Sequence, residues 1–492
     1  MKSPLAALAL LGLSVALAWA VFFKGAVWPA DWYVSLTLIG ISSCVFWSLR
    51  RRESRPSRLN VWLARLLAAL PVYIALTLVP LPVRLLDALS PARAALLRSL
   101  QPVIPALHSA PLTVNPPATV LHLFSILGYI AAFLLVREIA FSFSASPWLP
   151  AVPLILIAAF EAALGMLQIF GQSGAAFATG TYTNRDHFAG LLEMVLPFAF
   201  LAGLEAYRKK VQRRLQAKAA VLACLLWSAA ILLFLAVVYS LSRMGFIVAL
   251  LVLLLASAFS IGAAARSSRF RWLLAAGFCL TVILGSVFLT PDQLAGRFAA
   301  VSASQDSSTE IRAVIWRDTL PLISEYKVFG CGLGGFESAF AKHQAVANGY
   351  TVEFAHNDYL QYLAELGILG FSLLAAITIL FARDALRPLF STSDQNRRLP
   401  LLACISALAG MALHSFVDFN TYIPANALAL AWIAGIASAN APERVRRSRS
   451  THDLQSCYRN AWKAPETLQH APASSRDELQ TLARAVSNRA SR

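Results

Sequence analysis

Charged residues are scarce in this chain of 492 residues, in which Asp, Glu, Lys and Arg together make up only 14%. Hydrophobic residues make up 58%, which is more apolar surface than a soluble domain can bury. This composition excludes a soluble globular class. Repeated apolar runs of about 20 residues, the length of a helix that crosses a bilayer, instead predict an all-α polytopic membrane protein.

Cysteine is also scarce, with six residues, and only Cys331 falls clearly in a segment predicted to lie outside the cytoplasm. We therefore expect no disulfide on that side of the membrane. The sequence has neither a C-x-x-C pair nor a Cys/His spacing typical of a metal site. It predicts no bound metal and no cofactor.

The apolar runs predict about twelve transmembrane helices. Their approximate bounds are 4–23, 32–49, 60–80, 118–136, 149–170, 187–206, 219–241, 245–264, 272–290, 366–383, 399–416 and 423–440. The first run has the length of a signal peptide but lacks a convincing small-residue cleavage site, so we interpret it as a retained span. Residues 1–440 then form one membrane domain, and residues 441–492 form a basic, flexible cytoplasmic tail.

The formal net charge of +17 is distributed unevenly along the chain. Clusters of Arg and Lys follow the second, sixth, eighth, tenth and twelfth spans, which places them all on one side of the membrane. By the positive-inside rule this side is the cytoplasm, and both termini lie there. The charge therefore indicates contact with anionic lipid headgroups in the bilayer, and it argues against a nucleic-acid partner.

Two longer segments fall on the opposite, outer side. Residues 82–117 contain arginines among apolar residues, which predicts an amphipathic helix lying on the membrane. Residues 291–365 form a larger segment, predicted to be mostly helical. Within it, Arg312 and Trp316 share one face of an expected helix over 310–318.

A G-x-G-x-x-G pattern occurs at residues 330–335. We reject a dinucleotide site there, because the pattern lacks a βαβ context and faces away from the nucleotide pools. Glycines that permit a tight backbone turn are the better interpretation. Two carboxylates, Glu161 and Glu193, lie within apolar spans. Each either has a functional role or makes a hydrogen bond between packed helices.

Five polar clusters are predicted to meet on the outer face: 180–187, 240–245, 310–317, 356–365 and 414–420. Arg243 lies in a tight outer turn and breaks the positive-inside pattern, which favours an anion site over a snorkelling arginine. His356 starts a capped helix, where it serves either proton chemistry or capping. Asn184 either caps the next span or contacts a sugar or phosphate.

The clusters contain several arginines but no metal site. Arginine side chains without a metal ion are suited to binding a pyrophosphate leaving group.

The order of these motifs resembles the O-antigen ligase and polymerase superfamily. The resemblance covers about residues 150–440 and is carried by 356–360 with 365–367 and Gly370, by the 242–245 turn, and by Arg312 followed by Trp316. It further includes the glycine loop at 330–332 and the Asn184 loop. Each motif alone is weak, but their order is specific.

The resemblance implies a GT-C-like fold in the bacterial inner membrane, with the active site facing the periplasm. It implies an inverting, metal-independent glycosyltransferase that takes a glycan from undecaprenyl pyrophosphate. Its catalytic residues would be His356, Arg243 and Arg312. The substrate-binding candidates are Asn184, Arg185, His187, Ser242, Trp316, Asn357, Asp358, Gln361, Glu365, His414 and Asp418.

The acceptor stays open at this stage. Lipid A core would make the protein a ligase, and the end of another lipid-linked glycan would make it a polymerase. The outer segments are modest and no large C-terminal domain follows, which disfavours a protein acceptor. A lipid-linked sugar transporter is the alternative from another class, but transporters place polar groups near the midplane on repeated, broken helices. Here the polar residues gather at the outer ends of spans, and no repeat is visible.

Overall fold

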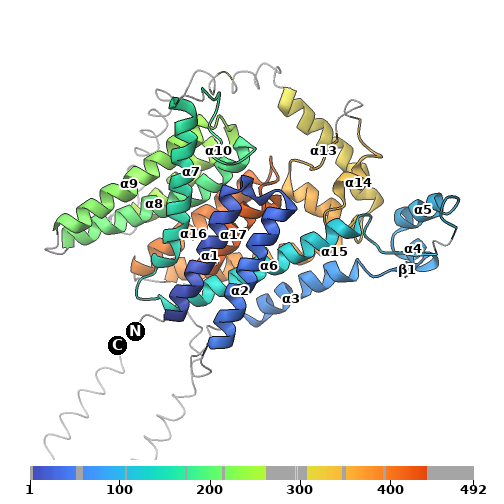
Figure 1. Ribbon diagram of the computed structural model, residues 1–492, viewed down its shortest axis with the longest axis horizontal. Coiled ribbons are helices and arrows are strands. Elements are labelled where there is room, and N and C mark those ends of the chain that lie inside the picture. Colours follow the sequence, from blue (N-terminus) through green and yellow to red (C-terminus); the bar gives the residue numbers. More distant parts are fainter. Residues whose placement is uncertain are drawn as a thin grey trace, which may run out of the picture. The chain divides into compact units, whose positions relative to one another are not determined.

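The computed structural model describes residues 4–50, 59–105, 108–171, 174–212, 216–261, 294, 296, 307–345, 351–391 and 395–439. Its regular structure is almost entirely helical, which confirms the predicted all-α class (Figure 1). Within the described ranges, strand occurs only as the short antiparallel pair β1, Leu81–Pro82, and β2, Ser109–Ala110. The basic tail predicted at 441–492 lies outside the described residues.

In the part of the chain that the structure describes, seven helical segments are long and apolar enough to cross a membrane: Pro4–Phe22 (α1), Pro29–Leu49 (α2), Pro116–Ser142 (α6), Leu149–Phe170 (η2 and α7), Arg185–Arg208 (in α8), Ala217–Tyr239 (in α9) and Asp358–Phe390 (in α15). Three shorter apolar ones are Val61–Leu76 (α3), Arg243–Ala258 (in α10) and Pro424–Ala439 (α17). Together with α16, Gln395–His414, they coincide with every predicted span except 272–290, which lies outside the described residues. The number twelve therefore stays a prediction.

Helix α8, Arg185–Gln212, is the most buried of the candidate spans in the described residues, since 89% of its apolar window is buried. It packs against α9 (Gln216–Tyr239), α10 (Arg243–Ile261), α16 and α17. Small residues allow the close approach: a side chain at Gly245 of α10 would meet Ala189 of α8. The start of α10 is thereby held against the start of α8, and both carry candidate site residues.

Helices α1, α2, α6 and α17 pack beside one another on another side of the domain (Figure 1). Gly12 of α1 accommodates Ser42 of α2, and Gly435 of α17 approaches the backbone of α6. The indole N–H of Trp32 in α2 donates to Ser125 of α6 at 2.7 Å, so the polar atom of a buried ring is satisfied between helices. This contact fixes one wall of the cavity described below.

The two segments predicted to lie on the outer side are called the outer segments here. The first, after α3, contains α4, Val83–Leu89, and α5, Pro91–Leu100, closed by the β1–β2 pair. Arg93, one of the arginines behind the predicted surface helix, is buried and donates from Nε to the carbonyl of Pro111 at 3.0 Å. It therefore holds the segment together from inside.

The second outer segment contains α13, Ser307–Glu325, and α14, Phe336–Phe340, and leads into α15, Asp358–Ser391. The predicted helix over 310–318 lies within α13. Between α13 and α14, Gly330, Gly332 and Gly334 all have positive φ, which confirms the tight-turn interpretation of the glycine pattern.

Helix α15 is broken at Gly367, whose φ is 62° and ψ −174°. The carbonyls of Ala364 and Glu365 accept from the amides of Cys331 and Gly332, and the amide of Ile368 donates to Lys327. A side chain at Gly367 would collide with the backbone of Gly330 and Val328. The break is therefore built in, and the outer 326–332 turn supplies the hydrogen bonds that the helix loses.

Candidate functional site

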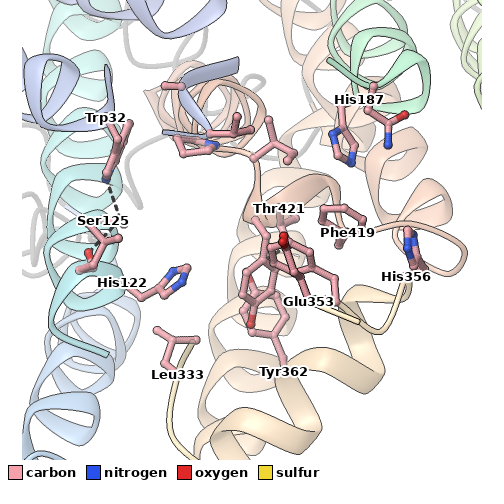
Figure 2. Close-up of a pocket in the computed structure, with 18 of the residues that line it drawn as sticks. Trp32, His122, Ser125, His187, Leu333, Glu353, His356, Tyr362, Phe419 and Thr421 are labelled. Atoms are coloured by element: carbon pink, nitrogen blue, oxygen red, sulfur yellow. Dashed lines mark hydrogen bonds between the residues drawn. The ribbon is translucent and has the colours of Figure 1, made fainter. Parts of the chain in front are cut away.

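A cavity of about 980 Å³ lies where the outer segment meets the ends of the membrane helices. Its wall comes from η1 (Lys24–Ala26) with the start of α2, from α6, α13 and residues 351–356, and from η3 (Asn420–Tyr422). Figure 2 shows Ser125 and His122 of α6 on one wall and His356 and His187 across from them. Three predicted site residues line this space: Asn184, His187 and His356.

His356 stands at the cavity in a strained backbone conformation. Its φ of 50° lies in the left-handed region, which costs a non-glycine residue about 1–3 kcal/mol and is typical of functional sites. The preceding residue, Ala355, is fixed on both sides, since its carbonyl accepts from the indole of Trp316 at 2.9 Å and its amide donates to the Gln361 side chain. These contacts hold the histidine where it is.

The residues after His356 close the start of α15. The side-chain oxygen of Asn357 accepts from the amides of Tyr359 and Leu360, which confirms a helix cap there. The carboxylate of Asp358 accepts from the hydroxyls of Ser415 and Thr421 at 2.7 and 2.6 Å. Both side chains therefore fasten the helix start to the segment after α16, and Asp358 is 2% exposed.

Asp418 is surrounded by three histidines. Its Oδ1 lies 3.7 Å from Nδ1 of His356, and its Oδ2 lies 3.6 Å from Nε2 of His187 and 3.9 Å from Nε2 of His414. These distances are longer than hydrogen bonds. Four of the atoms, the three ring nitrogens and Oδ1, are buried without a hydrogen-bond partner. The described residues contain no group of three or more His, Cys, Asp and Glu placed to hold a metal.

Asp418 is 1% exposed, and burial alone would raise the pKa of its carboxyl. The neighbouring His187, His356 and His414 rings outweigh that effect and hold the pKa of Asp418 well below its usual range. A carboxylate in this position can orient the His356 ring through Nδ1. The other nitrogen, Nε2, is then left for a ligand.

Aromatic rings connect the histidines across the cavity. Phe354 and Phe419 stack at 4.1 Å, and His356 and His187 each meet the Phe419 ring edge-to-face. Tyr422 continues the row toward Tyr362, at 5.0 Å. The cavity thus combines flat apolar surfaces with a few hydrogen-bonding groups, the lining typical of small-molecule sites.

The predicted arginines lie beside the cavity wall. Arg312 follows Ile311, which lines the cavity, and its Nη2 lies 3.7 Å from Asp186 of α8, the neighbour of His187. Arg243 begins α10, in the turn that Ser242 caps by accepting from the amide of Gly245. Arg185 lies over the ring of Phe177 at 4.8 Å. The structure therefore brings Arg312 next to the cavity residues of α8, and the 242–245 turn packs against the same helix.

Gln361 and Glu365 face away from the cavity lining and into the protein. The Glu365 carboxylate accepts from the amides of Gly334 and Phe336 and from the hydroxyl of Tyr422, and Gln361 donates to it at 3.0 Å. Glu365 is 1% exposed. In this structure Glu365 joins α15 to the glycine turn and to η3, and Gln361 supports its carboxylate.

Replacing Glu365 by alanine is therefore expected to destabilise the protein. Four donors, three of them buried, would lose their acceptor, and each buried unpaired group costs about 1–3 kcal/mol. A thermal unfolding measurement in detergent should show a clear loss of stability, with a smaller loss for Glu365→Gln. A wild-type melting temperature combined with weak substrate binding would instead assign Glu365 to the ligand.

The two intramembrane carboxylates have different environments. Both oxygens of Glu161 accept from Thr181, through its amide and its hydroxyl, so this residue anchors the loop that leads to Asn184. Glu193 lies 2.9 Å from Nδ1 of the buried His414. Glu161 is thus used in packing, whereas Glu193 belongs to the histidine cluster.

Several lining residues were not predicted, among them His122, Glu353, Phe354 and Thr421. His122 had a usable signal, because a titratable residue within an apolar span is functional by default. Thr421 had none, because its role comes from its position three residues after Asp418 and against Asp358.

Residues 228–375 match the family model described as O-antigen ligase. The match includes Arg243, Arg312 and His356, and it ends before Asp418. No curated protein matches the chain. Together with the glycine turn, the strained histidine and the apolar helices, this match confirms the predicted resemblance to the O-antigen ligase superfamily.

Proposed function

We propose that this protein is an O-antigen ligase-like glycosyltransferase. It moves a glycan from undecaprenyl pyrophosphate to an acceptor, lipid A core or a similar glycan, at the periplasmic face of the bacterial inner membrane. The observation that carries the proposal is the placement of His356, strained and facing the cavity with Asp418 behind Nδ1. A ring held in this way suits a general base.

In the reaction, the acceptor hydroxyl attacks the anomeric carbon of the donor sugar. His356 Nε2 takes the hydroxyl proton, a new C–O bond forms with inversion, and the bond to the pyrophosphate oxygen breaks with its electron pair. Asp418 stabilises the imidazolium that forms, 3.7 Å from Nδ1. The proton then leaves to water, because the His356 side chain is 32% exposed.

Arg243 and Arg312 neutralise the departing pyrophosphate. A guanidinium holds two phosphate oxygens in a planar fork, so no metal is required for this role. Arg312 stands beside Ile311 and Ile315 of the cavity wall, which allows the pyrophosphate to lie at the rim while the sugar lies among the aromatic rings. In this proposal Asn184 and His187, which also line the cavity, bind the sugar hydroxyls.

Reconstitution in proteoliposomes with a lipid pyrophosphate-linked glycan tests this function. Lipid A core and a second lipid-linked glycan are offered together as competing acceptors. Transfer to lipid A core is expected, and lengthening of the lipid-linked chain would instead make the protein a polymerase. Movement of the donor across the bilayer without any new glycosidic bond would establish the transporter alternative.

Transfer is expected to survive removal of divalent metal ions, because arginines supply the positive charge in this mechanism. The measurement compares the transfer rate before and after EDTA treatment. A rate lost with EDTA and restored by Mg²⁺ or Mn²⁺ would contradict the mechanism, and it would turn attention to Asp418 and Asp358 as ligands.

A further inference from the structure

A buried ion pair lies directly behind the proposed base. His414 and Glu193 are both 0% exposed, and Nδ1 of His414 lies 2.9 Å from Oε1 of Glu193. The other ring nitrogen of His414 points to Asp418, at 3.9 Å from Oδ2. One imidazole ring therefore stands between two buried carboxylates, on α16 between α8 and the segment that carries Asp418.

Asp418 needs a positive charge close to it. The one hydrogen bond found for its carboxylate within the described ranges comes from Asn420 at 3.3 Å, and a buried carboxylate with so little support is costly unless a cation is near. Among the contacts of the described residues, the groups near its carboxylate that can carry such a charge are the three surrounding histidines. His356 and His187 line the cavity, whereas His414 has a second carboxylate of its own.

We propose that His414, held by Glu193, supplies the resident positive charge beside Asp418 and so leaves His356 uncharged and ready to accept a proton. This inference rests on the proposed function, in which His356 is the base. His414 and Glu193 are positioning residues in this scheme, because they act on the reaction only through Asp418.

The charges of the cluster support this arrangement. Glu193, Asp418 and a protonated His414 sum to one negative charge, which faces His356 and His187. The other titratable groups near the cluster are Asp186 at the start of α8, whose carboxylate lies near Arg312, and Asp358 on α15. One remaining negative charge is enough to stabilise an imidazolium at His356 once the acceptor proton has moved there.

Replacing His414 by glutamine removes the resident charge. The negative charge of Asp418 then favours a proton on His356 or His187. In a plot of kcat/KM against pH, the acid limb should therefore move to higher pH by about one unit, or tenfold in proton concentration. A second variant, Glu193→Gln with His414→Gln, keeps two neutral amides that can pair with each other and removes one charge of each sign. Because Asp418 still loses the nearer, positive charge, a shift in the same direction but of smaller size is expected.

The matched control is His343→Gln, because His343 also pairs with a glutamate, Glu325, at 2.7 Å, but outside the cavity lining. It should leave the profile unchanged. A purely structural role for His414 would lower the rate at every pH without moving the limb, and that result would overturn the proposal.

A second readout separates this proposal from the proposed function. Diethyl pyrocarbonate modifies the uncharged imidazole, so its labelling of His356, followed by mass spectrometry across pH, reports the charge of that ring without any transfer. Labelling should require a higher pH in both glutamine variants. If the wild-type protein transfers no glycan but labelling in the variants still requires a higher pH, the proposed function alone is refuted. If the variants transfer glycan and their labelling occurs at the wild-type pH, the role of His414 is refuted.

Discussion

Replacing His356 by alanine is expected to lower single-turnover glycan transfer by about 10²–10⁴, the usual contribution of a general base. The donor should still bind, because the arginines proposed to hold its pyrophosphate remain in place. The variant should also fold, because alanine removes a ring that lies at the cavity wall and is 32% exposed. Lipid pyrophosphate binding and single-turnover transfer by the purified variant measure the two effects separately.

His343→Ala is the matched control for this variant, because it removes an outer-segment histidine that pairs with Glu325 rather than lining the cavity. It should transfer at close to the wild-type rate. If His356→Ala transfers glycan at the wild-type rate, His356 is not the general base. His187, which also lies beside Asp418, would then be the next residue to test.

Replacing Arg312 by lysine is expected to lower transfer by about 10²–10³, by analogy with the loss of one donor that stabilises developing charge. Lysine keeps the charge but loses the planar fork that spans two phosphate oxygens. Donor binding should weaken together with the rate, in contrast to the His356 variant. Arg243→Lys should behave in the same way, and equilibrium binding of the lipid pyrophosphate distinguishes the two classes of variant.

Arg317→Lys on the same helix provides the control, since Arg317 is 67% exposed and pairs with its neighbour Asp318. Its donor binding and rate should match the wild type. If Arg312→Lys binds the donor as tightly as Arg317→Lys does, the pyrophosphate lies elsewhere, and the contact of Arg312 with Asp186 is structural.

The fold was predictable largely because apolar length is a local property of the sequence. Each described membrane helix coincides with an apolar run that could be counted directly. The break at Gly367 was not predictable in this way, because a lone glycine within an apolar run is compatible with a continuous helix. The break depends on hydrogen bonds between α15 and the amides and carbonyls of the 326–332 turn, and the turn lies next to α15 only in the folded chain.

The candidate site was predictable in some of its residues but not in its contacts. The polar clusters at the outer span ends identified His356, His187, His414 and Asp418, and the structure joins them. The sequence could not distinguish a carboxylate that faces a ligand from one that binds its own backbone. Glu365 and Asp418 look alike in the chain, yet Glu365 accepts from amides of the glycine turn while Asp418 faces three rings.

The broken helix α15 has a mechanical consequence. Bilayers of different thickness change the tilt of a membrane helix. In an unbroken helix, such a change in the membrane half would also move the first turn, which carries Asp358. At Gly367 the two halves instead share a joint, and the outer half is tied to the 326–332 turn by Cys331 and Gly332. In the proposed mechanism, the position of His356 is therefore set by the 326–332 turn, and we expect a change in the tilt of the membrane half of α15 to be absorbed at Gly367.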